Sequence, residues 1–297
     1  MRQSIAPKDL AQAIGVSESS VKRWADEGRI IVSRTAGGHR RILIADAVKF
    51  VRTSGAKVER PELLGLSELE HLPHTVDLAK PMDTLLYEAL ERGDAPVVRG
   101  LLQSLYMQGS SIATIGDGPF AHALWKIGQL WQHAEWGIVI EHRATDILIA
   151  AVNQLRLLIG SADELAPIAV GGGAEFDPYI LPSLLVSTTL AEAGFKDINL
   201  GPRVPARLLK EAAARFEASM VWLSVSVEPP KKQAVSEIIE LSESLTKLGV
   251  SCLLGGRHVR DVLPVAPAKP AAGVHVMKSL TELSAFAKGI KARGPAV

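Results

Sequence analysis

A chain of 297 residues with 47% hydrophobic and 22% charged residues is typical of a soluble globular protein with two or three domains. Its single cysteine, Cys252, excludes a disulfide framework and a cysteine-based zinc site, and it fits a reducing cytosol. Because the sequence has no run of about 18 apolar residues and residues 1–5 lack the apolar core of a signal peptide, we expect a cytoplasmic protein with no membrane partner.

The formal net charge of +1 hides an uneven distribution of charge along the chain. Residues 1–60 contain 12 Lys and Arg against 6 Asp and Glu, a net of +6, whereas the remainder contains 21 against 26, a net of −5. A small basic head on a mildly acidic body is the electrostatic footprint of a nucleic-acid-binding protein. This distribution favours DNA as a partner of the first domain.

The basic head, residues 1–60, has the pattern of two short helices and a hairpin. Apolar spacing predicts helices over 7–14 and 18–26, with Ser17 as the N-cap of the second. Strands at 29–34 and 39–43 around a Gly-Gly turn predict a β-hairpin. Helix, short turn, helix and hairpin are the elements of a winged helix-turn-helix, whose second helix enters the major groove.

Val21-Lys-Arg-Trp24, followed by the basic segment 34–41, resembles the winged helix of MerR-type transcription regulators. The resemblance implies a homo-oligomer, a dimer or tetramer, that binds a double-stranded DNA operator with one head on each half-site. The alternative is a basic, solvated surface on a small helical domain. The residues expected to contact DNA are Ser19, Lys22, Arg23, Arg34, His39, Arg40 and Arg41.

Residues 61–78 mix leucines and acidic residues with two prolines, so we expect a linker there. No sustained heptad pattern follows, so dimerisation does not use a long coiled coil. Residues 79–160 contain amphipathic helical patterns with short joins, which predict an antiparallel four-helix bundle. Its expected helices span 83–92, 95–107, 112–132 and 137–159.

One indole, one carboxylate and one imidazole stand out in this apolar helical stretch, at Trp131, Glu141 and His142. Burying a carboxylate and an imidazole is costly unless each is paired, which favours a ligand pocket. Ten residues do not make a whole number of turns in an α-helix, so Trp131 and Glu141 would not share a face of one continuous helix. We therefore expect a break near residues 135–137, with the three side chains converging from two helices.

The pattern Gly128-x-x-Trp131-x9-Glu141-His142 is similar to the helical cap above cobalamin in light-sensing MerR regulators of the CarH/LitR type. The resemblance implies that Trp131 shields the upper face of the cofactor while Glu141 and His142 contact the upper ligand. His133 or His142 is then a candidate cobalt ligand, although the family's cap histidine directly follows the Trp. The alternatives are a core Trp and a Glu-His step that interacts with the helix dipole.

Residues 161–297 alternate apolar strands with helical patterns, which predicts a parallel, doubly wound sheet. Ligands bind such sheets beyond the carboxyl ends of the strands. The expected strands span 168–171, 198–200, 220–227, 250–254 and 274–277, and the expected helices span 180–194, 205–218, 231–248 and 280–291.

This α/β part resembles the Rossmann-like cobalamin-binding domain of the same regulators and of cobalamin-dependent methyltransferases and mutases. Ser224-x-Ser226 and Gly255-Gly256 match two of its motifs, and they suit the nucleotide tail of the cofactor. The first motif reads Asp177-x-Tyr179, with Tyr where the cobalt-binding His is expected. No His occurs between His142 and His258. Tyr179 is either a pocket wall, the preferred reading, or a ligand to another metal such as haem iron.

Together these patterns predict a multidomain α and α/β protein with a winged helix-turn-helix, a four-helix bundle and a Rossmann-like, flavodoxin-like domain. We expect a DNA-binding regulator controlled by adenosylcobalamin or a related tetrapyrrole held between the bundle and the α/β domain, with a response to light. The alternative is a related regulator that has lost cobalamin and acts without ligand or through a protein partner. An enzyme or a corrinoid carrier is least favoured, because no nucleophile elbow, P-loop or spaced metal set is present.

Overall fold

The structure is a computed structural model that describes residues 4–130, 135–230, 232–262 and 273–293. The chain divides into two units. The first comprises Met1–Ser111 and Gly118–Gly160, and the second comprises Ile112–Asp117 and Ser161–Val297. In the described ranges, no helix is both long enough and apolar enough to cross a bilayer.

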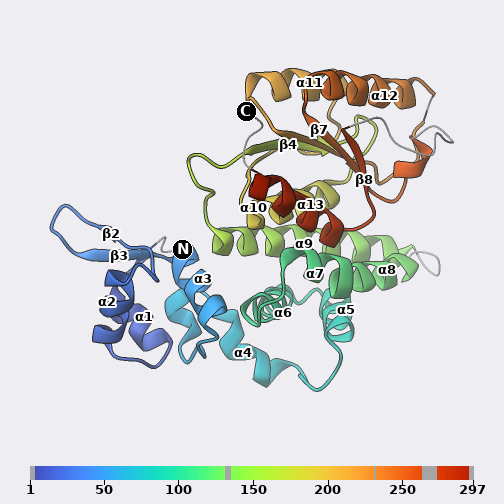
Figure 1. Ribbon diagram of the computed structural model, residues 1–297. Helices are drawn as coiled ribbons and strands as arrows, with labels where there is room; N and C mark the ends of the chain where they lie inside the picture. Colours follow the sequence, from blue (N-terminus) through green and yellow to red (C-terminus); the bar gives the residue numbers. More distant parts are fainter. Residues whose placement is uncertain (1–3, 131–134, 231, 263–272, 294–297) are drawn as a thin grey trace. The chain divides into compact units, whose positions relative to one another are not determined.

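The first unit begins with two short helices, α1 (Pro7–Ala13) and α2 (Glu18–Asp26), within one residue of their predicted bounds. The Ser17 side chain accepts a hydrogen bond from the backbone N–H of Ser20 at 3.1 Å, so it caps α2 as expected. Three strands form an antiparallel sheet in the order β1-β3-β2, and the β2–β3 hairpin extends beyond the helices (Figure 1). They span Ser4–Ile5, Ser33–Arg34 and Arg40–Leu43.

The strand predicted over 29–34 is wrong for residues 29–32, because only Ser33–Arg34 pairs with β3. The backbone of Arg29 instead donates to the Trp24 carbonyl at 2.8 Å and closes the end of α2. The Arg29 guanidinium lies 5.5 Å from the centre of the Trp24 ring. Arg29 is therefore held at the end of α2, and not in the hairpin, by its cation–π contact with Trp24 and by its backbone hydrogen bond to Trp24.

Helix α3 (Ile44–Ser54) follows the hairpin and joins the head to the rest of the first unit. Its Arg52 guanidinium stacks over the ring of Tyr106 at 3.6 Å from the centroid. The same side chain donates to the Ser110 carbonyl at 2.9 Å. Because α3 also packs on α9, the head is attached through a packed helix.

The expected linker over 61–78 is folded, which corrects the prediction. It contains the 3₁₀ helix η1 (Pro61–Leu64) and helix α4 (Glu68–Thr75), which packs on α6. Leu64, Leu66 and Leu72 are buried. A Cβ on Gly100 of α6 would lie 3.0 Å from Leu72, so this glycine permits the close approach of α4.

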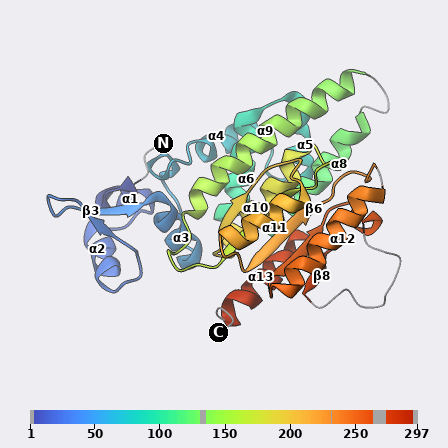
Figure 2. The ribbon, with the colours of Figure 1, turned by 90° about the horizontal axis from the view of Figure 1, so that it is seen from above.

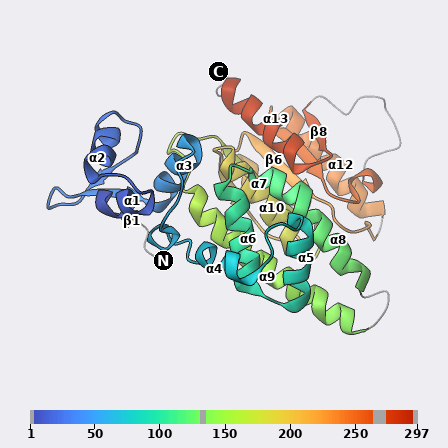
Figure 3. The same cartoon turned by 90° about the horizontal axis from the view of Figure 1, so that it is seen from below.

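The helical part of the first unit contains α5, α6, α8 and α9, which pack against one another (Figure 3). They span Met82–Arg92, Ala95–Met107, Ala121–Leu130 and Trp136–Ile159. The third predicted helix is not continuous: α7 (Ile112–Ile115) is followed by a π turn over Gly116–Phe120. Gly118 there has non-helical angles, φ −97° and ψ −108°, directly before Pro119. Proline lacks an N–H and disfavours helical geometry in the residue before it, so the helix breaks.

The described strands of the second unit form a parallel five-stranded sheet in the order β5-β4-β6-β7-β8, the flavodoxin-like arrangement that was predicted. Helices α11 and α12 cover one face, and α10 and α13 cover the other (Figures 1 and 2). Strands β4 to β8 span Ile168–Gly173, Lys196–Asn199, Met220–Ser224, Ser251–Gly255 and Val274–Met277. The helices span Ile180–Glu192, Ala206–Arg215, Lys232–Lys247 and Leu280–Arg293.

Alternate strand residues fill the two cores, as the pleat of a sheet requires. Val221 and Leu223 of β6 face α11 and α12, whereas Met220 and Trp222 face α10 and α13. A Cβ on Gly171 would lie 2.2 Å from the Trp222 ring, so the glycine leaves room for the indole over β4. There its Nε1 donates to the Asp197 side chain of β5 at 3.0 Å.

Candidate functional site

The carboxyl edge of the sheet is organised around the buried side chain of Asp177, in the loop between β4 and α10. One carboxylate oxygen accepts from the backbone N–H of Ser226 at 2.6 Å, and the other accepts from Tyr179 N–H at 3.0 Å. The side chain is fully buried. Because Ser226 follows β6, one carboxylate links the loops after two neighbouring strands.

The serine and glycine motifs lie on the same edge. The hydroxyls of Ser224 and Ser226 are 3.2 Å apart, and Ser224 is buried at the end of β6. Gly256 follows β7 with φ 107°, and a Cβ there would lie 2.3 Å from the Val225 carbonyl oxygen. The structure therefore brings Asp177, Ser224, Ser226 and the Gly255-Gly256 pair together around three adjacent strand ends.

Exposed apolar side chains surround this polar floor. Tyr179 is 49% exposed, Ile180 48% and Leu200 39%. The loops that carry them are tied together, since Arg203 N–H donates to the Asp177 carbonyl at 3.1 Å. Exposed aromatic and aliphatic side chains on loops held by these hydrogen bonds suit a ligand with a broad apolar face. Tyr179 stands at the start of α10, in the position where the sequence pattern expected an imidazole.

A His-Asp pair on the next loop did not figure among the predicted site residues. Nδ1 of His258 lies 2.7 Å from Oδ2 of Asp261, and the His258 backbone N–H donates to the Val225 carbonyl at 2.9 Å. The pair is formed by the 3₁₀ turn Val259–Asp261. Across the described parts of the chain, His, Cys, Asp and Glu do not gather in groups of three or more that could hold a metal ion.

The helical candidates lie on α9 and beside it. The described part of α8 runs to Leu130 and α9 begins at Trp136. Most of the residues between them lie outside the described ranges, so the predicted break stays a prediction. Glu141 and His142 lie early in α9, with Glu141 partly exposed and His142 exposed. Trp131 and His133 lie outside the described residues. Their predicted roles, and the convergence of Trp131 with Glu141 and His142, stay predictions.

The predicted DNA-contacting residues lie on α2 and on the hairpin. In α2, the Lys22 ammonium pairs with Glu18 at 2.8 Å, and Ser19 bonds to the Ser17 hydroxyl at 2.8 Å. Arg23 lies 3.8 Å from Glu27. Both basic side chains of α2 are at least half exposed, so they remain available to a nucleic acid.

The hairpin arginines differ in their surroundings. Arg40 binds Asp26 at 2.6 Å and the Lys22 carbonyl at 3.1 Å, and its side chain is only 20% exposed. Arg34 reaches the Gly38 carbonyl at 3.5 Å, and Arg41 reaches the Ser4 carbonyl at 3.4 Å. Arg40 therefore fastens the hairpin to α2. His39 completes the predicted set at the tip side of the hairpin, where it is exposed.

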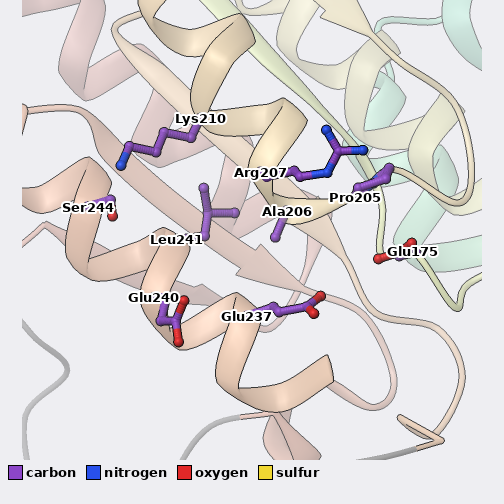
Figure 4. Close-up of a pocket in the computed structure, with 9 residues that line it drawn as sticks. All are labelled: Glu175, Pro205, Ala206, Arg207, Lys210, Glu237, Glu240, Leu241 and Ser244. Atoms are coloured by element: carbon purple, nitrogen blue, oxygen red, sulfur yellow. The ribbon is translucent and has the colours of Figure 1, made fainter. Parts of the chain in front are cut away.

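A groove of about 430 Å³ lies between α11 and α12 (Figure 4). Two cations, Arg207 and Lys210, and three carboxylates border it. This charged lining suits a small polar ligand and includes none of the predicted residues. We therefore place the candidate site at the carboxyl edge. The groove is lined by Glu175, Pro205, Ala206, Arg207, Lys210, Glu237, Glu240, Leu241 and Ser244.

The single cysteine belongs neither to the carboxyl-edge site nor to the groove between α11 and α12. Cys252 is buried in β7, and burial raises the pKa of its thiol to about 12. A thiol with so high a pKa is a poor nucleophile and a poor metal ligand near neutral pH. It serves as a small apolar side chain of the core.

Three comparisons with known proteins bear on the site. A family profile described as a B12 binding domain matches residues 84–156, which run from α5 into α9 and include Glu141 and His142. Dimethylamine corrinoid protein 3 of Methanosarcina mazei is 33% identical over 117 residues, which cover 38% of this chain and 69% of that protein. Dimethylamine corrinoid protein 1 of Methanosarcina acetivorans is 29% identical over 135 residues, 44% of this chain and 62% of that protein.

A solved structure shows the same fold. The monomethylamine corrinoid protein of Methanosarcina barkeri superposes with a TM-score of 0.50 and 19% identity, covering 69% of this chain and 95% of that chain. A helical part and a parallel sheet of the kinds described above therefore occur in a solved protein. At this identity, the likeness concerns the fold alone.

Proposed function

Because the chain belongs to the family of corrinoid proteins with a B12-binding domain, we propose that it is a corrinoid-binding regulator that binds DNA through residues 1–60. The corrinoid lies on the carboxyl edge of the parallel sheet, and the basic head reads an operator. The observation that carries the proposal is the convergence of Asp177, Ser224, Ser226 and Gly256 at one sheet edge, in a chain that also bears a basic head.

The residues at this edge fit the tail of a corrinoid. A Cβ on Gly256 would lie 2.3 Å from the Val225 carbonyl oxygen, so this glycine is what lets the loops after β6 and β7 pack closely at this edge. The Ser224 and Ser226 hydroxyls can exchange their mutual hydrogen bond for one to a ring nitrogen. Tyr179 and Ile180 offer apolar area to the macrocycle. When bound, the corrinoid would supply a cobalt ion whose ligands can exchange.

The head supports DNA binding of the MerR type. Lys22 and Arg23 project from α2, the helix that would enter the major groove, and Arg34, His39 and Arg41 belong to the hairpin. Contacts to base edges specify sequence, whereas contacts to phosphates fix the docking. An oligomer places two heads on two half-sites. In this proposal the chain has no enzyme activity of its own.

A second candidate function is a corrinoid carrier in a methyltransferase system. The names of the relatives, dimethylamine corrinoid proteins, favour it. Two features of this chain speak against it. Tyr179 replaces the imidazole that the carrier family uses below cobalt, and the basic head has no role in a carrier.

The test uses the full chain purified from a cobalamin-replete host. Its absorbance spectrum and titrations with adenosylcobalamin and hydroxocobalamin report corrinoid binding. Selection from a random-sequence DNA library then yields an operator, whose affinity is measured with and without corrinoid, in darkness and in light. We expect bound corrinoid and an operator affinity that changes on loading.

The controls separate the parts of the proposal. The double change Lys22→Ala and Arg23→Ala should abolish operator preference, whereas Lys57→Ala, an exposed cation of the same domain outside α2 and the hairpin, should not. Operator affinity indifferent to every corrinoid and to light would support a regulator that has lost its cofactor. No selected operator, with corrinoid bound, would favour the carrier.

A further inference from the structure

The groove between α11 and α12 has the size and the lining of a site for a small molecule. We infer that it binds a dipolar organic molecule, whose anionic end lies against α11 and whose cationic end lies against α12. The inference goes beyond the proposed function and does not require a corrinoid. The groove volume of about 430 Å³ falls within the roughly 300–1,000 Å³ of small-molecule sites.

The helical repeat places the charges of the groove in two rows. Arg207 and Lys210 are three residues apart, so they share one face of α11. Glu237 and Glu240 have the same spacing and share one face of α12, which packs against α11 (Figure 4). Glu175, from the loop after β4, adds a third carboxylate. The cations therefore come from one helix, and two of the three carboxylates come from the other.

The charges of the two rows are not used up within the protein. Among the residues that the structure describes, no hydrogen bond or ion pair engages the side chains of Arg207, Lys210 or Glu240. The lining also includes the buried Leu241 and the half-buried Ala206, which give the groove an apolar floor. A ligand that pairs with both rows at once can therefore lie on apolar side chains between them.

The mixed charge of the lining selects the class of ligand. An anion such as phosphate would be attracted by the cations of α11 but repelled by the carboxylates, and a polyamine would meet the opposite conflict. A molecule with a carboxylate at one end and an ammonium group at the other meets complementary charge at both ends. Because packed helices lie about 8–10 Å apart, several bonds must separate these two groups. An ω-amino acid or a dipeptide meets this requirement, whereas an α-amino acid does not.

Nuclear magnetic resonance of the full chain, labelled with ¹³C at leucine methyl groups, tests the inference. The Leu241 methyls report on the floor of the groove, and those of Leu245, one turn further along α12 and outside the groove, are the internal control. Leu241→Met and Leu245→Met assign the signals. The probes are 6-aminohexanoate and glycylglycine. Since exposed ion pairs contribute little, we expect a saturable shift of the Leu241 signals at millimolar concentrations and no shift for Leu245.

Single-charge probes and matched variants identify the two ends of the site. Hexanoate, hexylammonium and glycine should bind about fivefold more weakly than the better dipolar probe. Neutralising either row, by Arg207→Gln with Lys210→Gln or by Glu237→Gln with Glu240→Gln, should weaken that probe by a similar factor. The control variants neutralise exposed charges of the same helices outside the groove and should leave the affinity unchanged; they are Arg215→Gln and Glu243→Gln.

Three results would overturn the inference. The first is the absence of a saturable Leu241 shift with both dipolar probes. The second is a single-charge probe that binds as tightly as the dipolar ones, which would indicate an attraction of one charge to the surface. The third is an equal loss of affinity in the control variants and in the variants of the two rows.

Discussion

Replacement of Asp177 tests whether one carboxylate holds the carboxyl edge together. It accepts two backbone hydrogen bonds, at 2.6 and 3.0 Å, and is fully buried. A hydrogen bond to a charged group contributes about 1.5–3 kcal/mol, and a buried N–H left unpaired costs a similar amount. Asp177→Ala should therefore lower the free energy of unfolding of the second unit by roughly 3–5 kcal/mol. Asp177→Asn keeps one oxygen acceptor but places its NH₂ group opposite the other backbone N–H. We therefore expect about half the loss in the free energy of unfolding.

The assay follows hydrogen exchange by mass spectrometry, because the two units need not unfold together and a single melting curve would merge them. Exchange of the Ser226 and Tyr179 amides should accelerate in both variants, and the peptides of β4 and β6 should lose protection in Asp177→Ala. Asp163→Ala is the matched control, since Asp163 accepts one backbone hydrogen bond, from Leu165, at an exposed site. Equal protection in Asp177→Ala and Asp163→Ala would refute the reasoning.

Three further predictions concern separate parts of the chain. Gly256→Ala should destabilise the second unit and abolish corrinoid binding, because the new Cβ would lie 2.3 Å from a carbonyl oxygen at a residue whose φ is 107°. Gly249→Ala is the control, since Gly249 has a φ of 72° and open space around it. Equal unfolding midpoints of the two variants would contradict the prediction. In salt titrations of operator binding, Arg34→Ala should reduce the slope by about 1, whereas Arg40→Ala should weaken binding with little change of slope because Arg40 is bound to Asp26. Burial raises the pKa of Cys252 from 9.0 to about 12, so the unfolded chain loses its thiol proton first as the pH rises. The Cys252 thiol should therefore contribute a loss of stability across that interval, and Cys252→Ala should make the alkaline loss of stability smaller than in the wild type.

The sheet and its binding edge could be predicted because their determinants are local or topological. Each strand is an apolar run of the right length, and parallel strands bring all their carboxyl ends to one edge. Asp177, Ser224 and Gly256 therefore had to be neighbours once the strand order was right. The helix cap at Ser17 was equally local.

The features that were missed depend on partners distant in sequence or on a turn geometry. The composition of segment 61–78 is that of a linker, and its packing becomes evident only in the fold, where Leu72 contacts α6 at Gly100. Arg40 looks like a free cation until the hairpin brings it to Asp26. No sequence motif marked His258, because its contact with Asp261 forms only when the 3₁₀ turn Val259–Asp261 brings the two side chains together.

The attachment of the head decides which fragment can report on DNA binding. The backbone N–H groups of Glu59 and Arg60 donate to the Ala13 carbonyl at 2.8 and 3.2 Å. The buried Leu64 ends η1, which packs against α1. A fragment cut after Arg60 would expose the surface of α1 that this turn covers and would strip Arg52 of its stacking ring on Tyr106. If such a fragment failed to shift DNA in a gel, the failure could reflect its damaged fold and would not test DNA binding. Truncations intended to isolate the proposed DNA-binding function should keep the chain through α9, because α3 packs on that helix.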